Sequence, residues 1–85
     1  MDRFSNAINA IDAARSTLLT FGDARAAAAL QGIEVYSVES ARVALNTIRC
    51  LKPCSMEGGF ALLDATQALE VATYQRPMTY LAAVA

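Results

Sequence analysis

The chain has 85 residues, of which 55% are hydrophobic and 18% charged, and its formal net charge is −1. This length fits one domain, residues 1–85, and a domain so small removes only roughly 60% of its unfolded surface from water on folding. The scattered basic residues and small net charge give no electrostatic basis for binding nucleic acid or an anionic membrane. We therefore expect surplus apolar surface that another polypeptide covers.

The sequence contains no stretch of about 18 consecutive apolar residues, the length that a membrane span needs, and its first residues lack the pattern of a signal peptide. We expect a cytoplasmic protein with no membrane partner. Cys50 and Cys54 are then expected to be free thiols, with Cys50 half-buried. The chain has no His, so a zinc site or a His-activated nucleophile is not expected within one subunit, and we predict no enzyme activity and no cofactor.

Apolar residues recur every three or four positions over residues 3–20, which predicts an amphipathic helix ended by Gly22. Asp23 is a candidate N-cap for a second, Ala-rich helix over about 24–31, closed by Gly32. Residues 33–37 alternate weakly but have no strand to pair with, so they are interpreted as a connection. The predicted buried stripe of the first helix is Phe4, Ala7, Ile8, Ile11, Ala14, Leu18 and Phe21.

Ser37 is a candidate N-cap for a third helix over about 38–52, and Pro53 is expected to stop it. Residues 53–59 contain most of the later helix breakers and predict the loop of a helical hairpin. The third helix carries a strong apolar stripe and a weaker one, so it is expected to contact neighbours on two sides. These stripes are Val38, Ala41, Ala44, Leu45, Ile48 and Leu51, and then Val43, Thr47 and Cys50.

A fourth helix is predicted over about 60–76, with two apolar faces. One face is Leu62, Ala65, Leu69 and Ala72, and the other is Phe60, Leu63, Val71 and Tyr74. The last eight residues have no charged side chain and are expected to pack on the body or on a partner. The predicted fold class is therefore all-α, a compact bundle of about four short helices with an apolar C-terminal arm.

The segment of residues 24–43 resembles the helix-turn-helix of small bacterial and phage repressors. Ala28 and Gly32 match the small residue and the Gly, four positions later, that frame the turn of that motif. The resemblance implies a DNA-binding regulator in which Arg42 and Arg49 contact DNA. It competes with a plain helical hairpin, because Glu39 would place a carboxylate beside the DNA. Nucleic acid is therefore the alternative partner.

Several large side chains fall outside the main stripes and belong to types that are enriched in protein interfaces. From them we predict a non-enzymatic protein-interaction module that acts as an inhibitor, anti-activator or adaptor by covering a surface of a larger protein. A homodimer is also expected, and a structural subunit of a larger assembly is a further alternative. The candidate interaction residues are Tyr36, Tyr74, Arg76, Met78, Tyr80 and Leu81.

Overall fold

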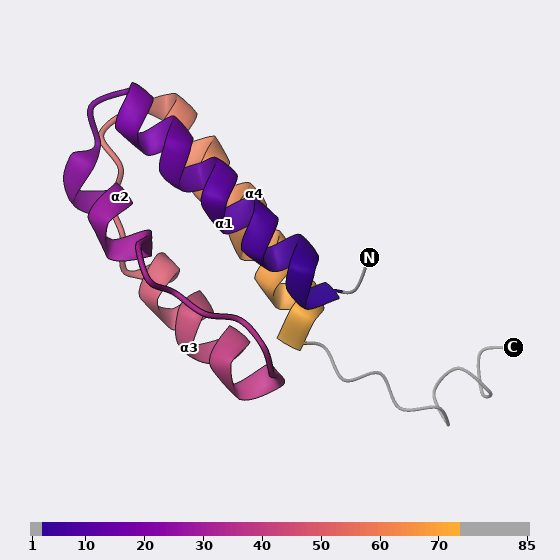
Figure 1. The fold of residues 1–85 in the computed structure, drawn as a ribbon. Coiled ribbons are helices and arrows are strands. Elements are labelled where there is room, and N and C mark those ends of the chain that lie inside the picture. Colours follow the sequence, from indigo (N-terminus) through magenta and orange to yellow (C-terminus); the bar gives the residue numbers. More distant parts are fainter. Residues whose placement is uncertain (1–2, 74–85) are drawn as a thin grey trace, which may run out of the picture.

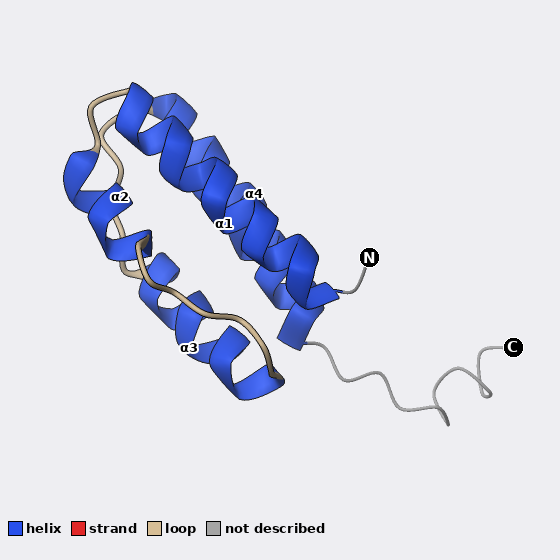
Figure 2. Ribbon diagram, in the orientation of Figure 1, coloured by secondary structure: helices blue, strands red, loops and turns tan. Residues whose placement is uncertain are grey.

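Four helices make up the part of the chain that the computed structural model describes, residues 3–73 (Figures 1 and 2). Within residues 3–73 no strand occurs, so the all-helical fold expected from the sequence is confirmed. The predicted C-terminal arm lies outside the described residues. The helices are α1 (Arg3–Thr20), α2 (Ala24–Leu30), α3 (Val38–Arg49) and α4 (Met56–Thr73).

The helices α1 and α4 lie side by side and run in opposite directions, while α2 and α3 follow one another along the other side of the molecule (Figure 1). The helix α4 contacts both α1 and α3, and α2 packs against α1. The buried residues of α4 recur at helical spacing along one side of the helix, whereas the residues of the opposite side are exposed.

The core between these helices is built largely from small side chains. Half of its sixteen buried hydrophobic residues are Ala. Leu18 of α1 and Leu69 of α4 are the largest side chains that are fully enclosed. The face of α4 predicted from Leu62, Ala65, Leu69 and Ala72 is buried in full, as expected. The core residues are Ala7, Ile11, Ala14, Leu18, Ala26, Ala27, Leu30, Val35, Ala41, Ala44, Leu45, Ile48, Leu62, Ala65, Leu69 and Ala72.

Fewer residues of the predicted apolar stripes are buried than expected from the sequence. Ile8 and Phe21, expected in the buried stripe of the first helix, are 38% and 48% exposed. Val43, expected in a second contact face of α3, is 66% exposed. Each of these helices has neighbours on one side only, so its apolar arc extends beyond the contact. Val35 is an addition, since it enters the core from the connection between α2 and α3.

Two of the predicted helix signals form as expected. Gly22 has φ of 85°, and the Asp23 N–H donates to the Leu18 carbonyl at 2.7 Å, which ends α1 in a Schellman motif. At the start of α3, the Ser37 hydroxyl accepts from the Ser40 N–H at 3.2 Å. The Ser40 hydroxyl in turn accepts from the Ser37 N–H, completing a capping box.

The connection between α3 and α4 corrects the sequence prediction. The helix α3 ends at Arg49, before the expected end near residue 52, and α4 begins at Met56, before the expected start at residue 60. The connection is thus residues 50–55, and the hairpin loop predicted over 53–59 is wrong. Gly58 and Gly59, taken from the sequence as turn residues, lie in the first turn of α4.

The enclosed core and the exposed half of α4 predict unequal effects for two substitutions on one helix. Leu69→Ala empties a site that is 0% exposed, so it is expected to lower the free energy of unfolding by about 2–5 kcal/mol. Leu63→Ala, at a residue 51% exposed, is expected to change it by about 0.5 kcal/mol or less. Urea unfolding followed by circular dichroism measures both, and equal losses would contradict the assigned orientation of α4.

Candidate functional site

The outward half of α4 carries a stripe of large apolar side chains, interrupted by one polar residue, which we call the α4 face. Its members are Met56, Phe60, Leu63 and Val71, which are 74%, 61%, 51% and 62% exposed. Steps of four, three and eight residues place them along one side of a helix. Gln67, also exposed, occupies the remaining turn between Leu63 and Val71. Three of the four residues predicted for the second apolar stripe of α4, Phe60, Leu63 and Val71, belong to this face, and Tyr74 lies outside the described residues. Within residues 3–73 no helix packs on this stripe.

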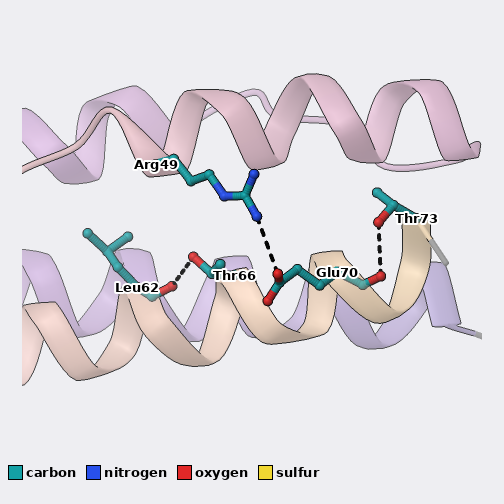
Figure 3. A network of polar contacts seen from close by, with 5 residues as sticks. All are labelled: Arg49, Leu62, Thr66, Glu70 and Thr73. Carbon is teal, nitrogen blue, oxygen red and sulfur yellow. Dashed lines mark hydrogen bonds and ion pairs between the residues drawn. The ribbon is translucent and has the colours of Figure 1, made fainter.

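Acidic side chains border the α4 face. Glu57 and Asp64, seven residues apart, lie along one edge, and Glu70 lies on the other. All three are exposed. The Glu70 carboxylate is 3.3 Å from Nη2 of Arg49, which reaches across from α3 (Figure 3). Glu57 and Asp64 form no ion pair with any described residue.

The pair between Arg49 and Glu70 links α3 to α4 at the rim of the α4 face. Both side chains are more than half exposed, so the pair contributes only about 0–1 kcal/mol to stability. On the same helix, the hydroxyls of Thr66 and Thr73 donate to the carbonyls of Leu62 and Glu70 at 2.8 and 2.9 Å (Figure 3). These hydroxyls are satisfied within α4 and are not available to organise a ligand.

A hydroxyl fixes the start of α4. The Ser55 Oγ accepts from the N–H of Gly58 at 3.0 Å, which is the bond that an N-cap side chain makes with the third helical residue. Glu57 follows in the first turn, where a carboxylate complements the positive end of the helix dipole. The sequence contained this signal, because Ser is a favoured N-cap and Glu57 lies two residues later, but the two glycines indicated a turn instead.

The carboxylate of Asp23 joins the turn after α1 to the start of α4. Its Oδ1 accepts from the Cys54 N–H at 2.8 Å, and its Oδ2 accepts from the Ser55 Oγ at 2.7 Å and the Ser55 N–H at 3.3 Å. Asp23 was expected to cap α2, and this expectation is wrong for its side chain. Asp23 directly precedes α2, but its carboxylate makes no capping hydrogen bond there. The carboxylate instead accepts hydrogen bonds from two neighbouring N–H groups and a hydroxyl, those of Cys54 and Ser55, which are more than thirty residues away in the chain.

These hydrogen bonds lower the pKa of Asp23 below the ordinary carboxyl value. The largest cause is the backbone N–H of Cys54, followed by the Ser55 hydroxyl, and burial opposes them. Both donors favour the charged form of the carboxylate. Asp23 is 6% exposed and is the one polar residue in the buried part of the described chain. The ionised carboxylate is therefore the form that holds α4 in place.

Gly58 permits the close approach at this junction. A Cβ added there would lie 2.8 Å from Cδ2 of Leu18, 2.8 Å from Oγ of Ser55 and 2.9 Å from Oδ2 of Asp23. The neighbouring Gly59 has only Cγ of Pro53 near its corresponding position, at 3.8 Å. Glycine is required at 58 by packing against α1, and this contact outweighs its low helix propensity.

Of the interaction residues predicted from the sequence, Tyr36 is the one that lies among the described residues. Tyr36 is 72% exposed, but it lines an open groove between the connection of residues 31–37 and α3, together with Ile33, Glu39 and Val43. The residues Tyr74, Arg76, Met78, Tyr80 and Leu81 lie outside the described residues.

The segment that resembles a helix-turn-helix does not form one in space. The motif joins its helices through three or four residues at a steep angle, whereas seven residues, 31–37, connect α2 to α3 here. The two helices follow one another instead of packing together (Figure 1). Arg42 and Arg49 are exposed and one heptad apart on α3, but Arg49 is engaged with Glu70.

The two cysteines are free, as expected, and both are exposed, which corrects the half-buried position predicted for Cys50. Among residues 3–73 no group of three or more His, Cys, Asp or Glu side chains is arranged to hold a metal ion. Over the same residues, none of the helices combines the length and hydropathy needed to cross a membrane. The α4 face is thus the main feature of the described surface.

Comparison of the chain with protein-family models, with curated protein sequences and with solved structures finds no match.

The Asp23 junction predicts a specific dependence of stability on pH. Asp23→Asn places an amide among N–H and O–H donors, so it is expected to lower the free energy of unfolding at pH 7. Because the pKa of Asp23 is lower in the folded chain, its contribution is complete above the unfolded value of about 3.9 and is lost as the pH falls through the folded value. The difference between wild type and Asp23→Asn should be constant from pH 7 to 5 and shrink below about pH 4. Urea titrations at each pH measure it, and a difference that does not shrink as the pH falls below about 4 would contradict this role.

The two adjacent glycines predict effects of opposite sign. Gly58→Ala is expected to destabilise the protein, because three atoms lie within 2.9 Å of the new methyl group. Gly59→Ala is expected to stabilise it by up to about 1 kcal/mol, since the methyl group has room and Ala favours the helix. Thermal unfolding of the two variants side by side measures both effects. Stabilisation by both would show that α4 does not approach α1 closely at Gly58.

Proposed function

We propose that this chain is a small, non-enzymatic protein-interaction module that binds another polypeptide through the α4 face and covers part of its surface. The supporting observation is the α4 face itself, four large apolar side chains that are each at least half exposed on one helix. Met and Phe are side-chain types enriched in the cores of protein interfaces. An inhibitor, anti-activator or adaptor would use such a face to occlude a site on a larger protein.

Packing among the described helices does not explain why these exposed side chains are apolar. The core closes without them, because α4 already buries a complete second stripe against α1 and α3. Each apolar side chain left in water forgoes the roughly 1.5–3 kcal/mol that full burial of a Leu or Phe provides. A partner that covers the α4 face would recover this free energy on binding, minus the cost of association.

The helix-turn-helix alternative receives less support. A DNA-binding face needs several cations directed at the phosphates, and the exposed side of α3 that contains Arg42 also contains Glu39. We therefore place the functional surface on α4 and not on α3.

Site-directed photo-crosslinking in the cells that produce the protein tests the proposal. A benzophenone amino acid at Gln67, in the middle of the α4 face, is expected to capture one dominant polypeptide, whereas the same residue at Asn46 on exposed α3 is the matched control. Leu63→Asp should abolish the adduct at Gln67 while the circular dichroism spectrum is preserved. An adduct of twice the chain mass would identify a second copy as the partner.

Two results would contradict the proposal. Equal adducts from Gln67 and Asn46 would show non-specific proximity, and an adduct at Gln67 that survives Leu63→Asp would show that the apolar side chains do not hold the partner. Val43→Asp, at a comparably exposed residue of α3, controls for the new charge.

A further inference from the structure

The charges around the α4 face restrict what can occupy it. All three ionisable side chains of α4 are acidic, Glu57, Asp64 and Glu70, and the helix has no basic residue. Glu70 is compensated by Arg49, but Glu57 and Asp64 have no ion-pair partner among the described residues. One edge of the apolar stripe therefore presents two uncompensated carboxylates two helical turns apart.

We propose that the α4 face binds an amphipathic helix of another protein that has basic residues along one side of its apolar stripe. This inference rests on the proposed function and specifies the partner of the same face. A helix fits because Met56 and Val71 are fifteen residues apart, about 22 Å along the axis, which is the length of four turns. Apolar anchors repeating at helical spacing on a partner match those of α4.

The partner helix is not a second copy of α4. If two α4 helices packed face to face, four uncompensated carboxylates, Glu57 and Asp64 of each copy, would lie at the interface, and α4 has no basic residue of its own to pair with them. In an antiparallel pair centred near Leu63, the edges that contain Glu57 and Asp64 would meet, so the two Asp64 side chains would be near one another and both Glu57 side chains would lie along the same edge. Like charges brought together at a desolvating interface oppose association. The homodimer expected from composition is disfavoured on this face.

Basic residues on a partner helix could pair with the acidic edge of the α4 face. Lys or Arg side chains seven positions apart on the edge of its apolar stripe would come level with Glu57 and Asp64. Their long side chains reach over an apolar stripe while the charged ends stay in water. The pairs would be at the exposed rim, so their effect should weaken with salt.

Two synthetic peptides of eighteen residues test the inference. Both have the same Leu stripe at helical spacing, and they differ only in having Lys or Glu at the flanking positions. We expect the Lys peptide to bind about tenfold more tightly than the Glu peptide at low salt, by fluorescence anisotropy, and the ratio to fall as salt rises. The double substitution E57K/D64K should reverse the preference.

A matched control separates the edge of α4 from the charge of the whole chain. The substitutions E34K/E39K change the net charge by the same amount on exposed residues of another surface, and they should leave the preference for the Lys peptide unchanged. Leu63→Asp should weaken both peptides, because it interrupts the shared apolar stripe.

Each remaining outcome distinguishes the inference from the proposed function. If both peptides bind equally, bind more weakly to Leu63→Asp and bind E57K/D64K as they bind the wild type, the face binds helices without a preference for basic residues. That result overturns the inference and leaves the proposed function standing. If E34K/E39K reverses the preference as strongly as E57K/D64K does, net charge alone decides and the inference fails. Light scattering that shows a dimer abolished by Leu63→Asp would identify a second copy as the occupant and overturn it as well. If neither peptide binds while Gln67 still gives a crosslink lost in Leu63→Asp, a partner of other chemistry occupies the face.

Discussion

The close approach of α1 and α4 is the constraint on which the rest of the molecule depends. Ala7 and Ala14 on one helix, and Ala65 and Ala72 on the other, are all 0–1% exposed. Small side chains bring two helix axes toward the lower end of the usual 8–10 Å separation. This core encloses Leu18 and Leu69 fully, whereas Phe4 is only partly buried against it and Phe21, Tyr36 and Phe60 are exposed. The surplus of apolar surface is thus a consequence of an Ala-rich interior.

The same closeness explains the junction at the start of α4. At Gly58 the helix passes within contact of Leu18, and the carboxylate of Asp23 is held between the turn after α1 and the Ser55 hydroxyl. A buried carboxylate is costly unless donors surround it, and here two N–H groups and one O–H do so. The junction fixes the axial position of α4 and, with it, the position of the α4 face.

The sequence predicted the helices well where local signals and core contacts agree. The bounds of α1, the caps at Gly22 and Ser37, and the buried stripe of α4 follow from periodicity and capping chemistry. It failed where contacts distant in the chain decide: Asp23 bonds Cys54 and Ser55 instead of capping α2, and it thereby holds the Ser55 hydroxyl that caps α4 at Gly58. The second stripe of α4 was visible as a pattern, but periodicity alone does not say whether a neighbour inside the chain covers it.

Within the described residues no helix covers the second stripe, and this exposure is why we assign it to binding. The helices α1 and α3 occupy one half of α4, and α2 packs on α1 and not on the remaining half. Replacing Met56, Phe60 or Val71 with a polar residue would cost the fold little, because these side chains already lie mostly in water. The stability of the fold therefore does not require these apolar side chains. The acidic edge at Glu57 and Asp64 also makes the two sides of the apolar stripe different in charge, which a uniformly apolar surface would lack. The combination of an apolar stripe with carboxylates on one edge favours a helix of complementary charge as the partner, and the Asp23 junction fixes the start of the helix that carries both.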